Sequence, residues 1–146
     1  MARTPSPKVH NSPAITITRT AYAASELVYI AYANKPLRYQ HGKSKIAYIG
    51  TTKKGAGRVA NSAVWKAEEL FARKGVHTLE FYIIAAPRKG KVATYRKLER
   101  ALLLRFRERF GSIPHANKQG KNLRWRDEYE FVTPRRIDKI IDDFSA

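Results

Sequence analysis

The chain has 146 residues, and 29 lysines and arginines against 12 aspartates and glutamates give it a formal net charge of +17. The length suits one domain with a modest core, and the excess of positive charge favours a polyanionic partner. The absence of cysteine excludes disulfides and thiolate metal sites, and no apolar run approaches the roughly 18 residues of a membrane span, so we expect a cytoplasmic or nucleoid-associated protein with no membrane partner.

The first 14 residues are predicted to form a flexible arm. Residues 1–14 contain three prolines and almost no large apolar side chain, so they cannot bury enough surface to offset the entropy lost on ordering. Residues 15–146 are then expected to form a single domain. The alternating segment 15–18 at its start favours a short edge strand.

Three runs rich in β-branched and aromatic residues predict strands over 27–33, 45–51 and 78–86. The polar stretch 34–44, which contains a glycine and a proline, separates the first two runs. We therefore expect a long hairpin connection there.

Helical spacing of apolar residues predicts one helix over 57–74, capped by Gly75, and a second over 92–110. Thr133 offers an N-cap and Pro134 a first helical position for a third, C-terminal helix. The predicted fold class is a small α/β (α+β) domain, with a mainly antiparallel three-stranded sheet flanked by helices.

Five short elements follow one another in a distinctive order: Leu27-Val28-Tyr29, Tyr48-Ile49-Gly50, Arg58, Glu99 and Pro114-His115-Ala116-Asn117. This order resembles the GIY-YIG nuclease family, although Leu27 stands where the family has its first glycine. The step of 10 positions from Tyr48 to Arg58 is familiar in the family, whereas the 19 positions between Tyr29 and Tyr48 exceed those of compact members. The resemblance covers roughly residues 25–120.

The resemblance implies a catalytic site with one metal ion held by Glu99. This glutamate lies within the apolar stripe of its predicted helix, and a buried carboxylate needs a cation nearby. Spacing alone leaves two alternatives open, an ion pair with a neighbouring arginine and a bound metal. A single carboxylate with water and phosphate suits Mg²⁺ or Mn²⁺, which prefer oxygen ligands.

The resemblance also implies roles for the two tyrosines. Tyr29 would be the general base for the attacking water, and Tyr48 would position water or the phosphate. A phenol is a poor base at neutral pH unless a cation lowers its pKa, and Lys45 is a candidate for that support.

Arg58 would clamp the phosphate at a helix N-terminus, and Asn117 would orient Glu99 or the backbone of the site wall. An asparagine after Pro114 also suits a simple turn. Ser62 stands where many family members carry a tyrosine or histidine, so it is at most catalytic support and leaves room for a weakened or inactive protein.

Basic side chains are concentrated before residue 127. Residues 1–126 hold 26 basic and 6 acidic side chains, whereas residues 127–146 hold 3 and 6. Such groups neutralise phosphates without reading sequence. The predicted nucleic-acid contacts are Lys53, Lys54, Arg96, Arg100, Arg107, Lys118, Lys121, Arg124 and Arg126.

The sequence thus predicts a metal-dependent endonuclease that hydrolyses phosphodiester bonds of DNA, with RNA as the alternative substrate. One site cuts one strand, so double-strand cleavage would call for a homodimer or sequential nicking. Specificity is expected from inserted loops such as 34–44, from DNA structure or from a partner. Two alternatives stay open: a non-catalytic nucleic-acid-binding module on the same fold, and a structural RNA-binding protein.

Overall fold

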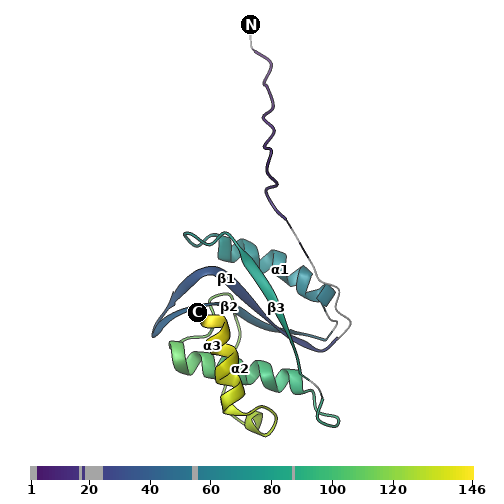
Figure 1. Ribbon diagram of the computed structural model, residues 1–146, viewed down its shortest axis with the longest axis vertical. Helices are drawn as coiled ribbons and strands as arrows, with labels where there is room; N and C mark the ends of the chain where they lie inside the picture. The colour runs from purple at the N-terminus through teal and green to yellow at the C-terminus, as the bar shows by residue number, and fades with distance from the viewer. Residues whose placement is uncertain (1–2, 17, 19–24, 54–55, 87) are drawn as a thin grey trace.

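A computed structural model describes residues 3–16, 18, 25–53, 56–86 and 88–146, with the side chains of 56–58 and 60–62 left out. Residues 3–16 and 18 contain no helix or strand and are exposed, and Figure 1 shows this segment extending away from the rest of the chain. Residue 17 lies outside the described residues, and its neighbours 15, 16 and 18 are not in a strand, so the edge strand predicted at 15–18 does not form over them.

The fold is α+β, as predicted, and its sheet has the order β2-β1-β3 with antiparallel pairing throughout. The strands are β1 (Leu27–Tyr39), β2 (Gly42–Thr52) and β3 (Leu79–Ala85). The central strand β1 begins with the apolar run Leu27–Ala31, and these first five residues are all buried. A strand buried on both faces carries such a continuous apolar run.

The segment 34–44 is not the long connection that the sequence suggested, because β1 and β2 continue through it to a tight turn. The pairing register shifts between Tyr32 and Leu37, and this irregularity accommodates Pro36, which cannot donate to a strand ladder. Beyond it Leu37 and Tyr39 resume alternation and are buried. The correction concerns the conformation of 34–44, and its role in specificity stays a prediction.

Three α-helices and a short 3₁₀ helix accompany the sheet: α1 (Ala56–Phe71), α2 (Thr94–Phe110), η1 (Glu128–Glu130) and α3 (Pro134–Ser145). Helix α1 ends before the predicted 74, because the chain tightens into a turn in which Arg73 N donates to Leu70 O. Gly75 lies in that turn with a positive φ of 80° instead of directly capping the helix. Thr133 caps α3 and Pro134 occupies its first turn, as predicted.

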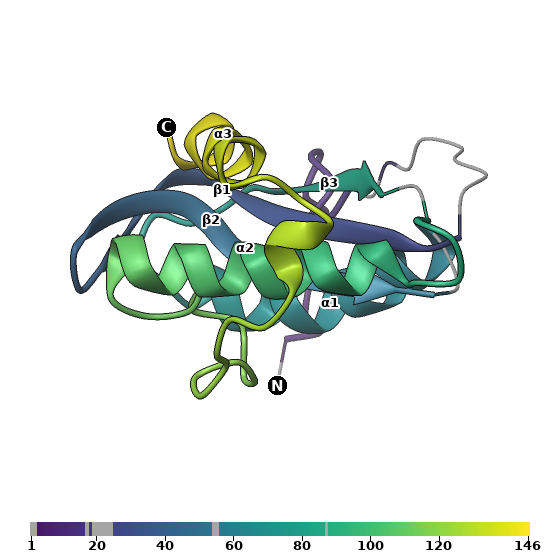
Figure 2. The ribbon, with the colours of Figure 1, turned by 90° about the horizontal axis from the view of Figure 1, so that it is seen from below.

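The helices divide between the two faces of the sheet. Figure 2 shows α3 above the sheet and α1 below it, while α2 packs against β2 and β1 and also contacts α3. Leu98, Leu102 and Phe106 on α2 are buried in the core that these elements share. Among the described residues, no helix has the length and apolar character needed to cross a bilayer.

Candidate active site

A pocket of about 480 Å³ lies between β2, α1, α2 and the segment 117–123. We call it the candidate pocket. Its lining contains three of the five residues singled out by the sequence, together with four cationic side chains. The residues that line it are Tyr48, Ile49, Lys66, Arg96, Glu99, Arg100, Leu103, Asn117, Lys118, Gln119, Gly120 and Leu123.

Strand pairing brings the two predicted tyrosines together. Tyr29 on β1 lies opposite Gly50 on β2, two residues beyond Tyr48, and the ring centroids of Tyr29 and Tyr48 are 5.7 Å apart. Tyr48 lines the pocket, whereas Tyr29 is only 3% exposed and is not part of the pocket lining. Burial of the phenol raises the pKa of Tyr48, and the contact with Tyr29 raises it further. The Tyr48 hydroxyl is therefore protonated at neutral pH.

Gly50 is required by this arrangement because a β-carbon there would lie 2.6 Å from Tyr48 Cε1 and 2.7 Å from Tyr29 Cζ. Gly50→Ala should therefore displace both rings and destabilise the fold by about 1–3 kcal/mol, the usual cost of overpacking. Denaturant unfolding measures this cost, and near-ultraviolet circular dichroism reports the ring environment. Unchanged spectra and stability would show that the tyrosines tolerate a side chain between them.

Glu99 projects from α2 into the candidate pocket and is partly buried. Burial raises the pKa of Glu99, while a hydrogen bond from Thr51 and the charges of Arg96 and Arg100 act in the opposite direction. Across residues 25–53, 63–86 and 88–146, none of the ion pairs includes Glu99. Within that part of the chain, no arginine or lysine lies within ion-pair distance of the Glu99 carboxylate, which instead lines the candidate pocket.

Asn117 acts on the backbone of β2. Its Nδ2 donates to Ile49 O at 2.8 Å and its Oδ1 accepts from Ile49 N at 3.0 Å. Ala116 N adds a bond to Ala47 O. Asn117 therefore contacts the backbone of the site wall, one of the two placements expected from the resemblance. It also forms the turn expected after Pro114, because Asn117 N donates to Pro114 O at 3.0 Å. The amide fixes the strand between Tyr48 and Gly50.

Lys66 is a site residue that the sequence analysis missed. Its Nζ lies 4.7 Å from the centroid of the Tyr48 ring and donates to Ala116 O at 2.8 Å. A cation over an aromatic face is attracted by the ring, so Lys66 is held at the pocket wall. A single lysine in an amphipathic helix carries no signal of its own. The sequence signal that could have found it is its spacing, four residues after Ser62 and eight after Arg58, because residues four apart are neighbours on a helix.

Three predicted site residues are not described at the level of the side chain, and a fourth lies elsewhere. The side chains of Arg58 and Ser62, and Lys54 as a whole, lie outside the described residues. Lys45 is described, and its Nζ lies 5.3 Å from the ring centroid of Tyr32. Tyr32 contacts Phe144 of α3, on the face of the sheet opposite the Tyr29–Tyr48 pair, so Lys45 is placed away from Tyr29, the base that it was expected to support.

The predicted nucleic-acid contacts divide into exposed and engaged side chains. Arg96 is exposed at the pocket, where its Nε donates to Tyr95 Oη, and Lys118 is exposed beside it. These groups are free to meet phosphates at or near the pocket. The other exposed members of the predicted set are Lys53, Lys121, Arg124 and Arg126.

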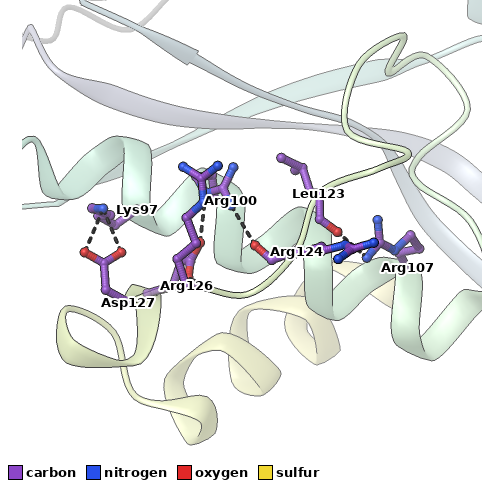
Figure 3. Close-up of polar contacts among 8 residues, drawn as sticks. Lys97, Arg100, Arg107, Leu123, Arg124, Arg126 and Asp127 are labelled. Atoms are coloured by element: carbon purple, nitrogen blue, oxygen red, sulfur yellow. Dashed lines mark hydrogen bonds and ion pairs between the residues drawn. The ribbon is translucent and has the colours of Figure 1, made fainter.

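Arg100 and Arg107 instead bind the chain itself (Figure 3). Arg100 Nε donates to buried Glu128 at 2.8 Å, and its Nη2 donates to Arg124 O. Arg107 donates to the carbonyls of residues 120, 121 and 123. Arg107 therefore holds the segment that closes the candidate pocket, and Arg100 holds the residues that follow it. Their role as phosphate contacts stays a prediction.

Arg107→Ala should lower stability, because hydrogen bonds to a charged group contribute about 1.5–3 kcal/mol. It should also loosen segment 117–123, which thermal unfolding and proteolysis would detect. Arg124→Ala is the matched control, since its exposed side chain should leave the unfolding midpoint near that of the wild type. Equal stability of both variants would show that the hydrogen bonds of Arg107 do not stabilise this segment.

The donor set of the pocket fits a hard divalent cation held at one protein carboxylate. Among the described residues there is no group of three or more histidine, cysteine, aspartate or glutamate side chains that could enclose a metal. Glu99, with the Thr51 hydroxyl beside it, offers oxygen donors suited to Mg²⁺ or Mn²⁺, which keep several waters when bound. The remaining ligands would be water and phosphate.

Comparison with known proteins found no matching protein family, no matching curated protein and no matching solved structure.

Proposed function

We propose that this protein is a metal-dependent endonuclease that hydrolyses phosphodiester bonds of DNA. The observation that carries the proposal is the convergence of Tyr48, Glu99 and Asn117 on one pocket that also holds Lys66, Arg96, Arg100 and Lys118. These residues come from β2, α1, α2 and the segment after α2. Cationic walls suit a phosphodiester, and the lone carboxylate among them suits a divalent ion.

The roles follow from placement. Lys66, Arg96 and Lys118 would bind phosphate oxygens, and Glu99 would hold Mg²⁺ or Mn²⁺. The ion, when bound, would add positive charge at the reacting phosphate and make a coordinated water more acidic. Because its pKa is raised, the Tyr48 hydroxyl stays protonated and would donate a hydrogen bond to a phosphate oxygen. This changes its expected role from positioning alone to charge stabilisation.

The test is incubation of the pure protein with supercoiled plasmid and Mg²⁺ or Mn²⁺, with and without chelator. We expect nicked and then linear DNA only when the metal is present. Tight DNA binding with no cleavage under any metal would instead identify the non-catalytic module, and selective binding of duplex RNA would identify the RNA-binding alternative. Second-order dependence of linearisation on protein concentration would indicate a dimer at the cut.

A further inference from the structure

A second hollow, of about 450 Å³, lies beyond the C-terminal end of α1, between the β1–β2 hairpin and the turn that follows the helix. We call it the hairpin hollow. Five of its seven lining residues are basic and none is acidic. The lining consists of Lys35, Pro36, Leu37, Arg38, Lys43, Arg73 and Lys74.

Like charges are forced together in the hairpin hollow. Arg38 on β1 and Lys43 on β2 are direct cross-strand partners, and like charges in that position are destabilising. Arg73 and Lys74 add two more positive charges from the turn. In the part of the chain that the structure describes, none of the five basic residues belongs to an ion pair. An external anion would relieve this repulsion.

The hollow is also held in place by a set of hydrogen bonds. Asn34 Nδ2 donates to Gly75 O at 3.0 Å, and Asn34 Oδ1 accepts from His77 N at 3.0 Å. Lys35 Nζ donates to Lys74 O at 2.9 Å. These bonds fasten the turn after α1 to β1, so the basic side chains are presented from a fixed backbone. A fixed backbone lowers the entropic cost of binding.

Helix α1 connects the hollow to the candidate pocket. Lys66 lines the candidate pocket, and the helix ends at Phe71, two residues before Arg73. At 1.5 Å per residue, five residues of helix correspond to about 8 Å along the axis. Duplex DNA carries a phosphate about every 3.4 Å on each strand, so a duplex of a few base pairs can span both places.

We infer that the hairpin hollow is a second phosphate-binding site for the DNA duplex engaged at the candidate pocket. It contacts the sugar–phosphate backbone beside the cutting site and contributes affinity and orientation without reading bases. The inference rests on the proposed function for its choice of DNA as partner. It gives the hairpin a role as a basic platform for the DNA backbone, whereas the sequence analysis named 34–44 as an inserted loop that could give specificity.

The test measures binding to a duplex of about 20 base pairs by fluorescence anisotropy, with chelator present so that no cleavage occurs. Each phosphate contact contributes roughly 0.9 to the slope of log affinity against log salt concentration. The double variant Arg38→Gln, Arg73→Gln should therefore flatten the slope by about 1.8. Lys43→Gln with Lys74→Gln provides a second, independent pair with the same expected result.

The matched control is Arg135→Gln with Arg136→Gln, two exposed arginines on α3 that remove the same charge from another element. This control should keep a slope near that of the wild type. Equal flattening in the control would show that the effect comes from net charge alone, and this would overturn the inference. An unchanged slope in both hollow variants, with folding confirmed by thermal unfolding, would also overturn it. Flattening on duplex RNA but not on DNA would also overturn it.

This experiment separates the two proposals. If the wild type fails to cut plasmid with metal, the proposed function falls, while the salt slopes still decide whether the hollow binds a duplex. If the wild type cuts and the hollow variants bind with unchanged slopes, the second site falls and the endonuclease stands.

Discussion

Glu99→Gln should abolish metal-dependent cleavage while duplex binding persists. Glu99 is the one carboxylate in the lining of the candidate pocket, so the amide removes the charge that would hold the ion. Loss of an outer-shell partner of a metal commonly costs 10- to 100-fold, so loss of the ligand itself should reduce the rate by more than about 100-fold. Single-turnover cleavage and anisotropy measured on the same preparation separate the rate from the affinity.

Stability distinguishes this role from a structural one. Burial raises the pKa of Glu99 above its ordinary value of 4.5, so its favourable contribution to stability is present below about pH 4.5 and is lost as the pH rises through the native pKa. At neutral pH the ionised side chain is a net cost, and Glu99→Gln should unfold at the same temperature as the wild type or higher. A lower midpoint would reveal an ion pair that the variant breaks.

The exposed glutamate Glu68 on α1 provides the control with the same change in charge. Glu68→Gln should keep full cleavage. Full activity of Glu99→Gln would remove the metal assignment.

The strands and helices could be predicted because their apolar periodicity is strong, as in the stripe of Leu98, Leu102 and Phe106. The continuation of β1 and β2 through residues 34–44 could not be predicted, because Lys35 and Pro36 interrupt the alternation before Leu37 and Tyr39 restore it. A bulge absorbs the interruption, and only the pairing with β2 shows this.

A site residue could be predicted where its type is unusual for its position in the sequence pattern. It could not be predicted where its role depends on contacts with residues far away in the sequence. Glu99 stands out in an apolar stripe, so the sequence could single it out. Lys66 does not stand out, because its significance depends on Tyr48 and Ala116, which other elements supply. The structural contacts of Arg107 were missed for the same reason, since its carbonyl partners lie in a segment of no regular structure 13 to 16 residues away.

Tyr48→Phe should reduce cleavage by about 100- to 1,000-fold, the usual cost of losing one donor to a developing negative charge. The phenylalanine ring keeps the contacts with Tyr29 and Lys66, so thermal stability should hardly change. Tyr29→Phe should cost less, because Tyr29 is buried behind Tyr48 and does not line the pocket. Tyr82→Phe, on the strand β3 and packed against α3, serves as the control that keeps activity.

The pH dependence of these variants decides between a donor and a base. If Tyr48 donates a hydrogen bond, its raised pKa keeps it protonated, so the ratio of wild-type to Tyr48→Phe rates should be constant between about pH 6 and 9. A general base would act only in its ionised form, and the ratio would then grow about tenfold per pH unit below its pKa. The same measurement on Tyr29→Phe tests the role that the family resemblance implies. A ratio that grows with pH for Tyr29 and stays flat for Tyr48 would make Tyr29 the base and Tyr48 the donor, whereas flat ratios for both would leave neither phenol to accept the proton.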